Sequence, residues 1–143
     1  MPNTLPEIQE EAWKRLKPMQ CVYLATGEGH QPRVRPVTLL NIDQKFWIAT
    51  GTRSAKARHM RRNPNVEFCL PLDAECGNGY LRIAGLAASV TDAATREAIG
   101  SQVPFLREYW TGRDDPQFAL FRITRVEIEY LRPGEMTPFT FLV

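Results

Sequence analysis

Residues 31–70 decide the fold, and their sequence is QPRVRPVTLLNIDQKFWIATGTRSAKARHMRRNPNVEFCL. Runs of β-branched and aromatic residues separated by short turns are the pattern of antiparallel strands. The predicted elements in this stretch are strands at 33–41, 45–50 and 65–72 and a helix at 54–62. Asn63 ends the helix because a residue that precedes a proline, here Pro64, is pushed out of the α region.

The rest of the chain extends this pattern. Thr4 and Glu7 have the spacing of a capping box, which predicts an N-terminal helix. The other predicted elements are strands at 20–26, 80–92 and 118–131, helices at 92–100 and 103–110, and a proline-containing tail at 132–143. Gly85 predicts a bulge or bend in its strand, and Pro36 predicts an edge or a bulge. We therefore expect a mainly β (α+β) fold, a six-stranded antiparallel barrel with two to four peripheral helices, as one domain over residues 1–143.

Composition limits the function classes. The chain has 143 residues, 43% hydrophobic and 24% charged, with a formal net charge of +2, which is ordinary for a globular domain. Such a modest charge argues against a nucleic-acid partner. The N-terminal residues have no apolar run of signal-peptide length, and no segment has the roughly 20 apolar residues of a membrane span. We expect a cytoplasmic protein without a membrane partner.

The three cysteines suit a reducing compartment better than a disulfide framework, because their number is odd. Cys21 and Cys69 lie in apolar runs, so we expect both to be buried strand residues, whereas Cys76 lies in a loop. The cysteines do not have a familiar metal spacing, and the two histidines, His30 and His59, do not complete a site. We therefore expect no metal site.

The stretch after the strand at 45–50 concentrates positive charge. Its cations are Arg53, Lys56, Arg58, Arg61 and Arg62. They fit a phosphate pocket, a nucleic-acid surface or a solvated helix face. A helix start favours anions because its first N–H groups are unpaired and the helix dipole is positive there. Thr50, Thr52 and Ser54 add hydroxyl groups, and Lys56 lies in the first turn. A phosphate cradle is therefore plausible, although it is not a P-loop.

A second pair of cations, Arg33 and Arg35, shares one face of the strand at 33–41, since strand side chains alternate. Pairing with the strand at 45–50 is expected to bring Arg35 near Thr50, so that a phosphate would meet Arg35 and Lys56 together. Three of the helix arginines share a stripe that is typical of a solvated face, and we exclude them from the site: Arg58, Arg61 and Arg62. Arg33 is expected to be a surface residue. Taken singly, Arg35 and Lys56 are as compatible with structural or solvated roles as with phosphate binding.

The segments QPRVRPVTLL, FWIATGTRSAKARHMRRNPNVEFCL and YLRIAGLAASVTD together resemble the pyridoxamine 5'-phosphate oxidase-like family of FMN-binding split β-barrels, in its general-stress-type branch. The resemblance is strong over residues 21–92, and residues 110–131 also look like that branch. It implies a split-barrel homodimer with FMN sites at the interface. The cofactor-binding positions that it implies are Arg35, Pro36, Val37, Thr38, Thr50, Gly51, Ser54 and Lys56, with Trp110 as a cover from the other chain.

Three departures limit the implied activity. Ala55 stands where the oxidase has a phosphate-binding arginine, and Leu40 and Asn41 stand where it has a lysine. The tail also lacks the oxidase's arginine and histidine motif for its substrate. We therefore expect an FMN-dependent oxidoreductase acting with a small-molecule electron donor or acceptor, not a true pyridoxamine phosphate oxidase. Its catalytic residues are unknown. The alternative is a non-catalytic module that carries or senses flavin, a deazaflavin coenzyme or haem, for which His30 and His59 are the candidate haem ligands.

Overall fold

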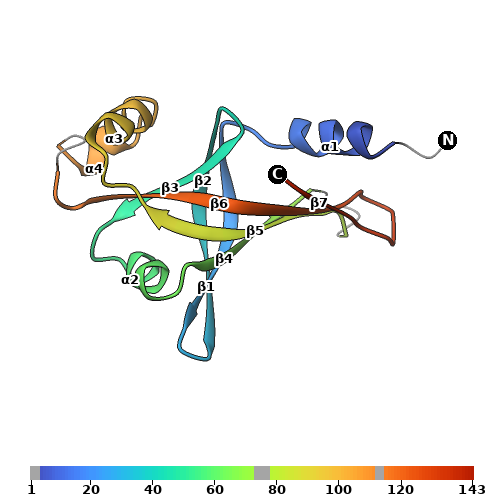
Figure 1. The fold of residues 1–143 in the computed structure, drawn as a ribbon, viewed down its shortest axis with the longest axis horizontal. Helices are drawn as coiled ribbons and strands as arrows, with labels where there is room; N and C mark the ends of the chain where they lie inside the picture. Colours follow the sequence, from blue (N-terminus) through green and yellow to red (C-terminus); the bar gives the residue numbers. More distant parts are fainter. Residues whose placement is uncertain (1–3, 73–77, 112–114) are drawn as a thin grey trace.

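Six antiparallel strands close into a barrel, and a seventh extends its sheet. The computed structural model describes residues 4–72, 78–111 and 115–143. Its strands are β1 (Met19–Glu28), β2 (Gln31–Ile42), β3 (Lys45–Gly51), β4 (Asn65–Pro71), β5 (Tyr80–Ser89), β6 (Phe118–Leu131) and β7 (Phe139–Leu142). The sheet order is β3-β2-β1-β4-β5-β6-β7, and an additional pairing of β3 with β6 closes the first six strands (Figure 1). The predicted six-stranded antiparallel barrel is confirmed.

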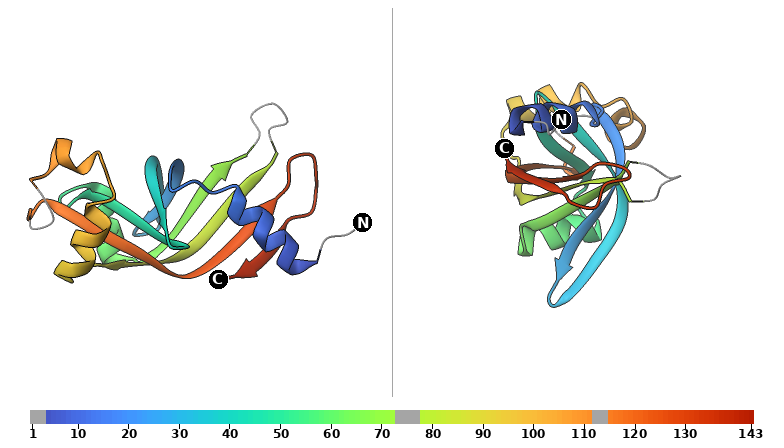
Figure 2. Two further views of the ribbon diagram at one scale, coloured as in Figure 1. Left: turned by 90° about the horizontal axis from the view of Figure 1, so that it is seen from above. Right: turned by 90° about the vertical axis from the view of Figure 1, so that its right-hand side faces the viewer.

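The helices lie at the two ends of the barrel and beside the β1–β2 hairpin (Figures 1 and 2). They are α1 (Leu5–Lys14), α2 (Ala55–Arg62), α3 (Ala93–Gly100) and the short α4 (Leu106–Tyr109). Thr4, Ser54 and Asp92 cap the first three through side-chain oxygens that accept a backbone N–H. The number of described helices agrees with the expected two to four, although α4 is shorter than the predicted helix at 103–110.

The barrel is split along β2. Its ladder with β3 contains only three residue pairs, from Leu40–Trp47 to Ile42–Lys45, whereas its ladder with β1 runs the whole length of β1, from Met19–Leu40 to Glu28–Gln31. Pro36 therefore pairs with Tyr23 of β1 and needs no N–H for β3, which confirms the predicted edge position. Because β2 and β3 diverge, the face of β2 that carries Arg35 opens toward α2.

The predicted irregularity at Gly85 is a β-bulge whose extra residue belongs to the partner strand β6, since Ala84 pairs with Glu127 and Leu86 with Thr124. The β5–β6 register shifts between Ala84 and Leu86, and Arg125 opposite has a positive φ of 52°. A Cβ on Gly85 would lie 2.6 Å from Ile123 Cγ2. Glycine is therefore required here by the close approach of β6.

Two apolar clusters hold the fold together. The larger fills the barrel and includes Phe68, Phe121 and Tyr130, and α1 covers it through Ile8 and Ala12. The smaller lies between the outside of β2, β3 and β6 and the helices α3 and α4. Its buried members are Leu40, Trp47, Ile99, Val103, Leu106, Phe118 and Leu120. Both faces of β3 are therefore buried, and α2 begins shortly after this well-packed strand.

The expected burial of Cys21 is wrong. Cys21 is exposed and Cys69 is half-buried, while Val22 and Leu24 are buried. The run that contains Cys21 is apolar on both faces, but only the even-numbered residues of β1 face the barrel interior. No described helix covers its outer face. Cys76 lies outside the described residues.

The proline-containing tail adds a strand that was not predicted, because Phe139–Leu142 forms β7 along β6. Within the described residues, no helix is long and apolar enough to cross a membrane.

Candidate functional site: an anion cradle at the start of α2

Hydroxyl groups and unpaired backbone donors gather where β3 passes into α2. Ser54 caps the helix, and its Oγ accepts the N–H of Ala57 at 3.2 Å. Thr50 Oγ1 lies 3.2 Å from the same Oγ, so it can donate to Ser54 and leave the Ser54 proton free for a ligand. The first two N–H groups of α2, from Ala55 and Lys56, have no acceptor within the helix. The turn therefore presents several donors to an anion.

Lys56 adds a half-buried ammonium group to these donors. In the described part of the chain it has no hydrogen-bond or ion-pair partner. Burial lowers the pKa of Lys56, and the positive charge of Arg35 lowers it further. Both causes disfavour a charged ammonium in the free protein, and both would be relieved by an anion placed between the two cations.

Three acceptors hold the Arg35 guanidinium. Nη1 donates to Thr26 Oγ1 at 2.7 Å and to the Leu24 carbonyl oxygen at 3.3 Å, and Nη2 donates to His59 Nδ1 at 3.3 Å. Burial, followed by the charge of Arg33, lowers the pKa of Arg35. Among the described residues Arg35 has no carboxylate partner. Its position near Lys56 agrees with the predicted cradle, but β2 brings it to α2 rather than along the β3 ladder to Thr50.

The other cations of α2 have different roles. The side chains of Arg58, Arg61 and Arg62 are exposed, as a solvated stripe predicts. Arg58 Nη1 also donates to the Arg53 carbonyl oxygen at 3.0 Å, and Arg61 Nη1 donates to that of Thr52 at 2.9 Å. Two arginines of the stripe therefore brace the turn that forms the cradle.

The remaining predicted positions lie on β2, at the end of β3 and at the C-terminal end of α4. Val37 and Thr38 are half-buried on β2, and Pro36 is exposed. Gly51 pairs with Phe118 at the end of the β3–β6 ladder. Trp110 is half-buried, with its ring centroid 5.5 Å from that of Phe118, so it packs in the outer apolar cluster of its own chain.

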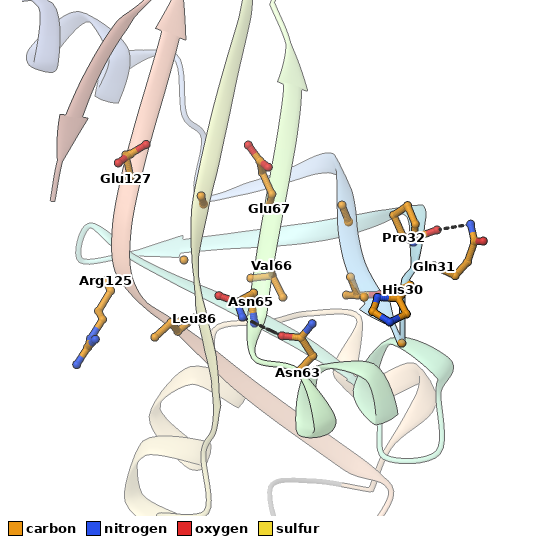
Figure 3. Close-up of a pocket in the computed structure, with 16 residues that line it drawn as sticks. His30, Gln31, Pro32, Asn63, Asn65, Val66, Glu67, Leu86, Arg125 and Glu127 are labelled. Carbon is orange, nitrogen blue, oxygen red and sulfur yellow. Dashed lines mark hydrogen bonds between the residues drawn. The ribbon is translucent and has the colours of Figure 1, made fainter.

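A separate open cavity of about 720 Å³ lies between the β1–β2 hairpin and the outer face of β4, β5 and β6 (Figure 3). Asn65 Nδ2 donates to Asn63 Oδ1 on its wall, and Arg125 points away from Glu67 and Glu127. None of the nine predicted cofactor-binding residues lines this cavity. In the described chain, no group of three or more potential metal ligands gathers at any point.

Sequence reasoning missed Thr26 and His59, which are both buried and anchor Arg35. The signal was the exposed stripe of α2: if Arg58, Arg61 and Arg62 face the solvent, then Met60 and its neighbour His59 face the protein. A polar side chain on that buried face needs a partner, but the sequence does not show which.

The closed strands and the split along β2 define a split β-barrel, and the start of α2 is its candidate anion site. The sequence profile described as pyridoxamine 5'-phosphate oxidase matches residues 8–132, and the chain belongs to that family. It is 30% identical to general stress protein 26 of Bacillus subtilis (strain 168) over 116 residues, 80% of this chain and 81% of the relative.

Solved structures share the fold. A NimC/NimA family protein from Clostridium acetobutylicum is 28% identical, with a TM-score of 0.76 over 94% of this chain and 91% of its own. A haem-binding protein from Mycobacterium smegmatis is 16% identical, with a TM-score of 0.70 over 87% of this chain and 53% of its own, which is a likeness of fold alone.

Proposed function

We propose that the chain binds FMN through its phosphate and acts as a flavin-dependent oxidoreductase, without being a true pyridoxamine phosphate oxidase. The observation that carries this proposal is the pair Arg35 and Lys56, two half-buried cations that no described acid neutralises. The family commonly binds flavin, which supports the choice of cofactor.

The residues present fit a phosphate. Arg35 and Lys56 would supply charge, Ser54 a hydroxyl donor, and the start of α2 its unpaired N–H groups. Each charge-assisted hydrogen bond contributes about 1.5–3 kcal/mol, so these groups can hold a phosphate without a metal ion. Val37, Thr38, Thr50 and Gly51 would border the flavin ring.

The family site is shared between two chains, and we propose that this chain forms a homodimer. Val34 (70% exposed) and Tyr23 (49% exposed) lie on the outer face of β2 and β1, beside Pro36 and Cys21. Contiguous exposed apolar side chains of this kind are typical of an interface. A second copy on this face would place its own Trp110 over the flavin bound to the first chain.

When bound, FMN supplies the hydride or electron chemistry between a small-molecule donor and acceptor. The chain's own residues would bind the phosphate and orient the ring against the backbone of β2. No described side chain is assigned as a catalytic acid or base.

A deazaflavin coenzyme, whose phosphate would occupy the same cradle, and haem are the alternative cofactors for a non-catalytic carrier or sensor. His59 does not favour haem, because both its ring nitrogens are engaged, Nδ1 by Thr26 and Arg35 and Nε2 by Glu28. His30 lies exposed in the β1–β2 turn.

An absorbance spectrum tests the cofactor. The purified chain is mixed with FMN, freed of excess and scanned, and we expect about one flavin per chain. The double variant R35A/K56A is expected to lose the flavin, while R62A, which removes an exposed arginine of the same helix, is expected to keep it. Equal retention by the double variant and R62A would contradict the phosphate site. Reduction of the bound flavin by NAD(P)H then separates an enzyme from a carrier.

A further inference from the structure

A hydrogen-bonded network beside the cradle links the exposed Glu28 through the buried His59 and Thr26 to the half-buried Arg35. His59 is 5% exposed and Thr26 is 3% exposed, and neither residue has a part in the proposed binding of FMN. Polar side chains this deeply buried are kept where their hydrogen bonds fix a geometry. The question is which geometry this network fixes.

The partners determine which ring nitrogen of His59 carries the proton. Arg35 Nη2 can only donate, so Nδ1 accepts at 3.3 Å, and the Thr26 hydroxyl at 2.8 Å shares the same single lone pair of Nδ1. The ring proton is then on Nε2, which donates to Glu28 Oε2 at 3.0 Å. Glu28 Oε1 accepts from Arg33 Nη2 at 3.1 Å. The chain of bonds is therefore directional, and it ends with two acceptors facing Arg35.

These acceptors take one particular edge of the guanidinium. Nη1 uses both its protons, on Thr26 Oγ1 and the Leu24 carbonyl oxygen, and Nη2 uses one on His59 Nδ1. The protons that have no partner in the described chain are those of Nε and the second on Nη2. These two lie on the same edge and form the fork that grips a phosphate with two parallel bonds.

We propose that His59, with Thr26, is the positioning residue that orients Arg35 so that its Nε/Nη2 edge faces the cofactor phosphate. This role rests on the proposed FMN site. Lys56, the other cation of the cradle, cannot form such a fork and acts as a point charge. The selectivity for a phosphorylated flavin then depends on His59 as an acceptor, not on its charge.

Two substitutions of His59 each keep the hydrogen-bonding function of one ring nitrogen and remove that of the other. In H59N the amide oxygen takes the place of Nδ1 and keeps an acceptor for Thr26 and Arg35, but the bond to Glu28 is lost. In H59Q the longer side chain reaches Glu28 and loses the acceptor. Both remove the ring, so a merely structural role predicts similar effects.

The readout is the ratio of the dissociation constants of riboflavin and FMN, measured by flavin fluorescence titration of the full chain after removal of bound flavin. Riboflavin lacks the phosphate, so the ratio isolates the phosphate contacts. We expect H59N to keep the wild-type ratio within about threefold and H59Q to lower it about tenfold with riboflavin binding unchanged, because one charge-assisted bond is weakened.

Equal ratios in H59N and H59Q would overturn the positioning role while leaving the FMN site intact. A wild-type chain that binds riboflavin as tightly as FMN would overturn the phosphate site itself, and the role of His59 with it. Should H59Q not fold, T26V serves instead: it removes the hydroxyl that bridges His59 and Arg35, and it is expected to lower the ratio by a similar factor. An unchanged ratio in T26V would overturn the proposal.

Discussion

Lys56 should oppose the stability of the free protein while it supports ligand binding. Its ammonium group is half-buried, has no partner in the described chain and lies close enough to Arg35 for that charge to lower its pKa. Methionine has almost the same length and keeps the packing of the aliphatic stem. K56M therefore removes an unfavourable charge without opening a cavity.

The two expected effects have opposite signs. Removing the desolvated charge is expected to stabilise the flavin-free chain by on the order of 1 kcal/mol, which for a domain of this size raises Tm by about 3–5 °C. Removing a cation from the phosphate is expected to weaken FMN binding by about 1.5–3 kcal/mol, or roughly 10- to 150-fold.

The pH dependence follows from linkage. The folded-state pKa of Lys56 lies below the ordinary lysine value of 10.5, so the unfolded chain binds more protons between these two values, and stability rises with pH in that window. The destabilisation of the folded chain by the charged Lys56 is fully present below the folded-state pKa. The Tm advantage of K56M should therefore be constant near neutral pH and shrink as the pH approaches 10.5.

The assay is thermal unfolding of flavin-free protein, followed by titration with FMN and with riboflavin. K45M is the matched control, because Lys45 is an exposed lysine at the start of β3 and no role at the site is assigned to it. A lower Tm for K56M would show that the ammonium stabilises the free chain, and unchanged FMN affinity would show that it does not contact the phosphate. Either result refutes the reasoning.

Four other changes have definite expected outcomes. G85A should destabilise the barrel by about 1–3 kcal/mol in urea unfolding, because its Cβ would lie 2.6 Å from a methyl group of β6; no loss would mean that the bulge relaxes freely. Y130F should lower the free energy of unfolding by about 1 kcal/mol, because it removes the hydrogen bond to Glu11. The pKa of Glu11 is lowered mainly by Arg132, so the stability that Glu11 contributes should fade as the pH drops below 4.5. A free energy of unfolding that stays flat through that range would contradict this. Y23K should give a monomer in light scattering with an unchanged circular dichroism spectrum, and a persisting dimer would exclude this face. A55R should tighten FMN about tenfold and leave riboflavin unchanged, since it restores a cation at the helix start; an equal gain for riboflavin would contradict a phosphate contact.

The sequence predicted those structural features that depend only on residues adjacent in the chain. The side-chain cap of Thr4 and the irregularity at Gly85 each follow from a residue and its immediate backbone. The burial of Cys21 did not follow, because alternation shows that a strand has two faces but not which of them another element covers. The anchoring of Arg35 did not follow either, since Thr26 and His59 are 33 positions apart and only the closed barrel brings them together.

The network explains how the cradle stays positive in a chain that carries acids close by. Glu28 is the carboxylate of the network, and an ion pair between it and Arg35 would fill the guanidinium edge that a phosphate needs. His59 accepts from Arg35 with one nitrogen and donates to Glu28 with the other, and Arg33 takes the second carboxylate oxygen. The imidazole thus keeps the acid and the arginine apart while satisfying both. The unneutralised charge of Arg35 and Lys56 is then a consequence of how the buried residues are bonded, and the cost of keeping it is what an anion would relieve on binding.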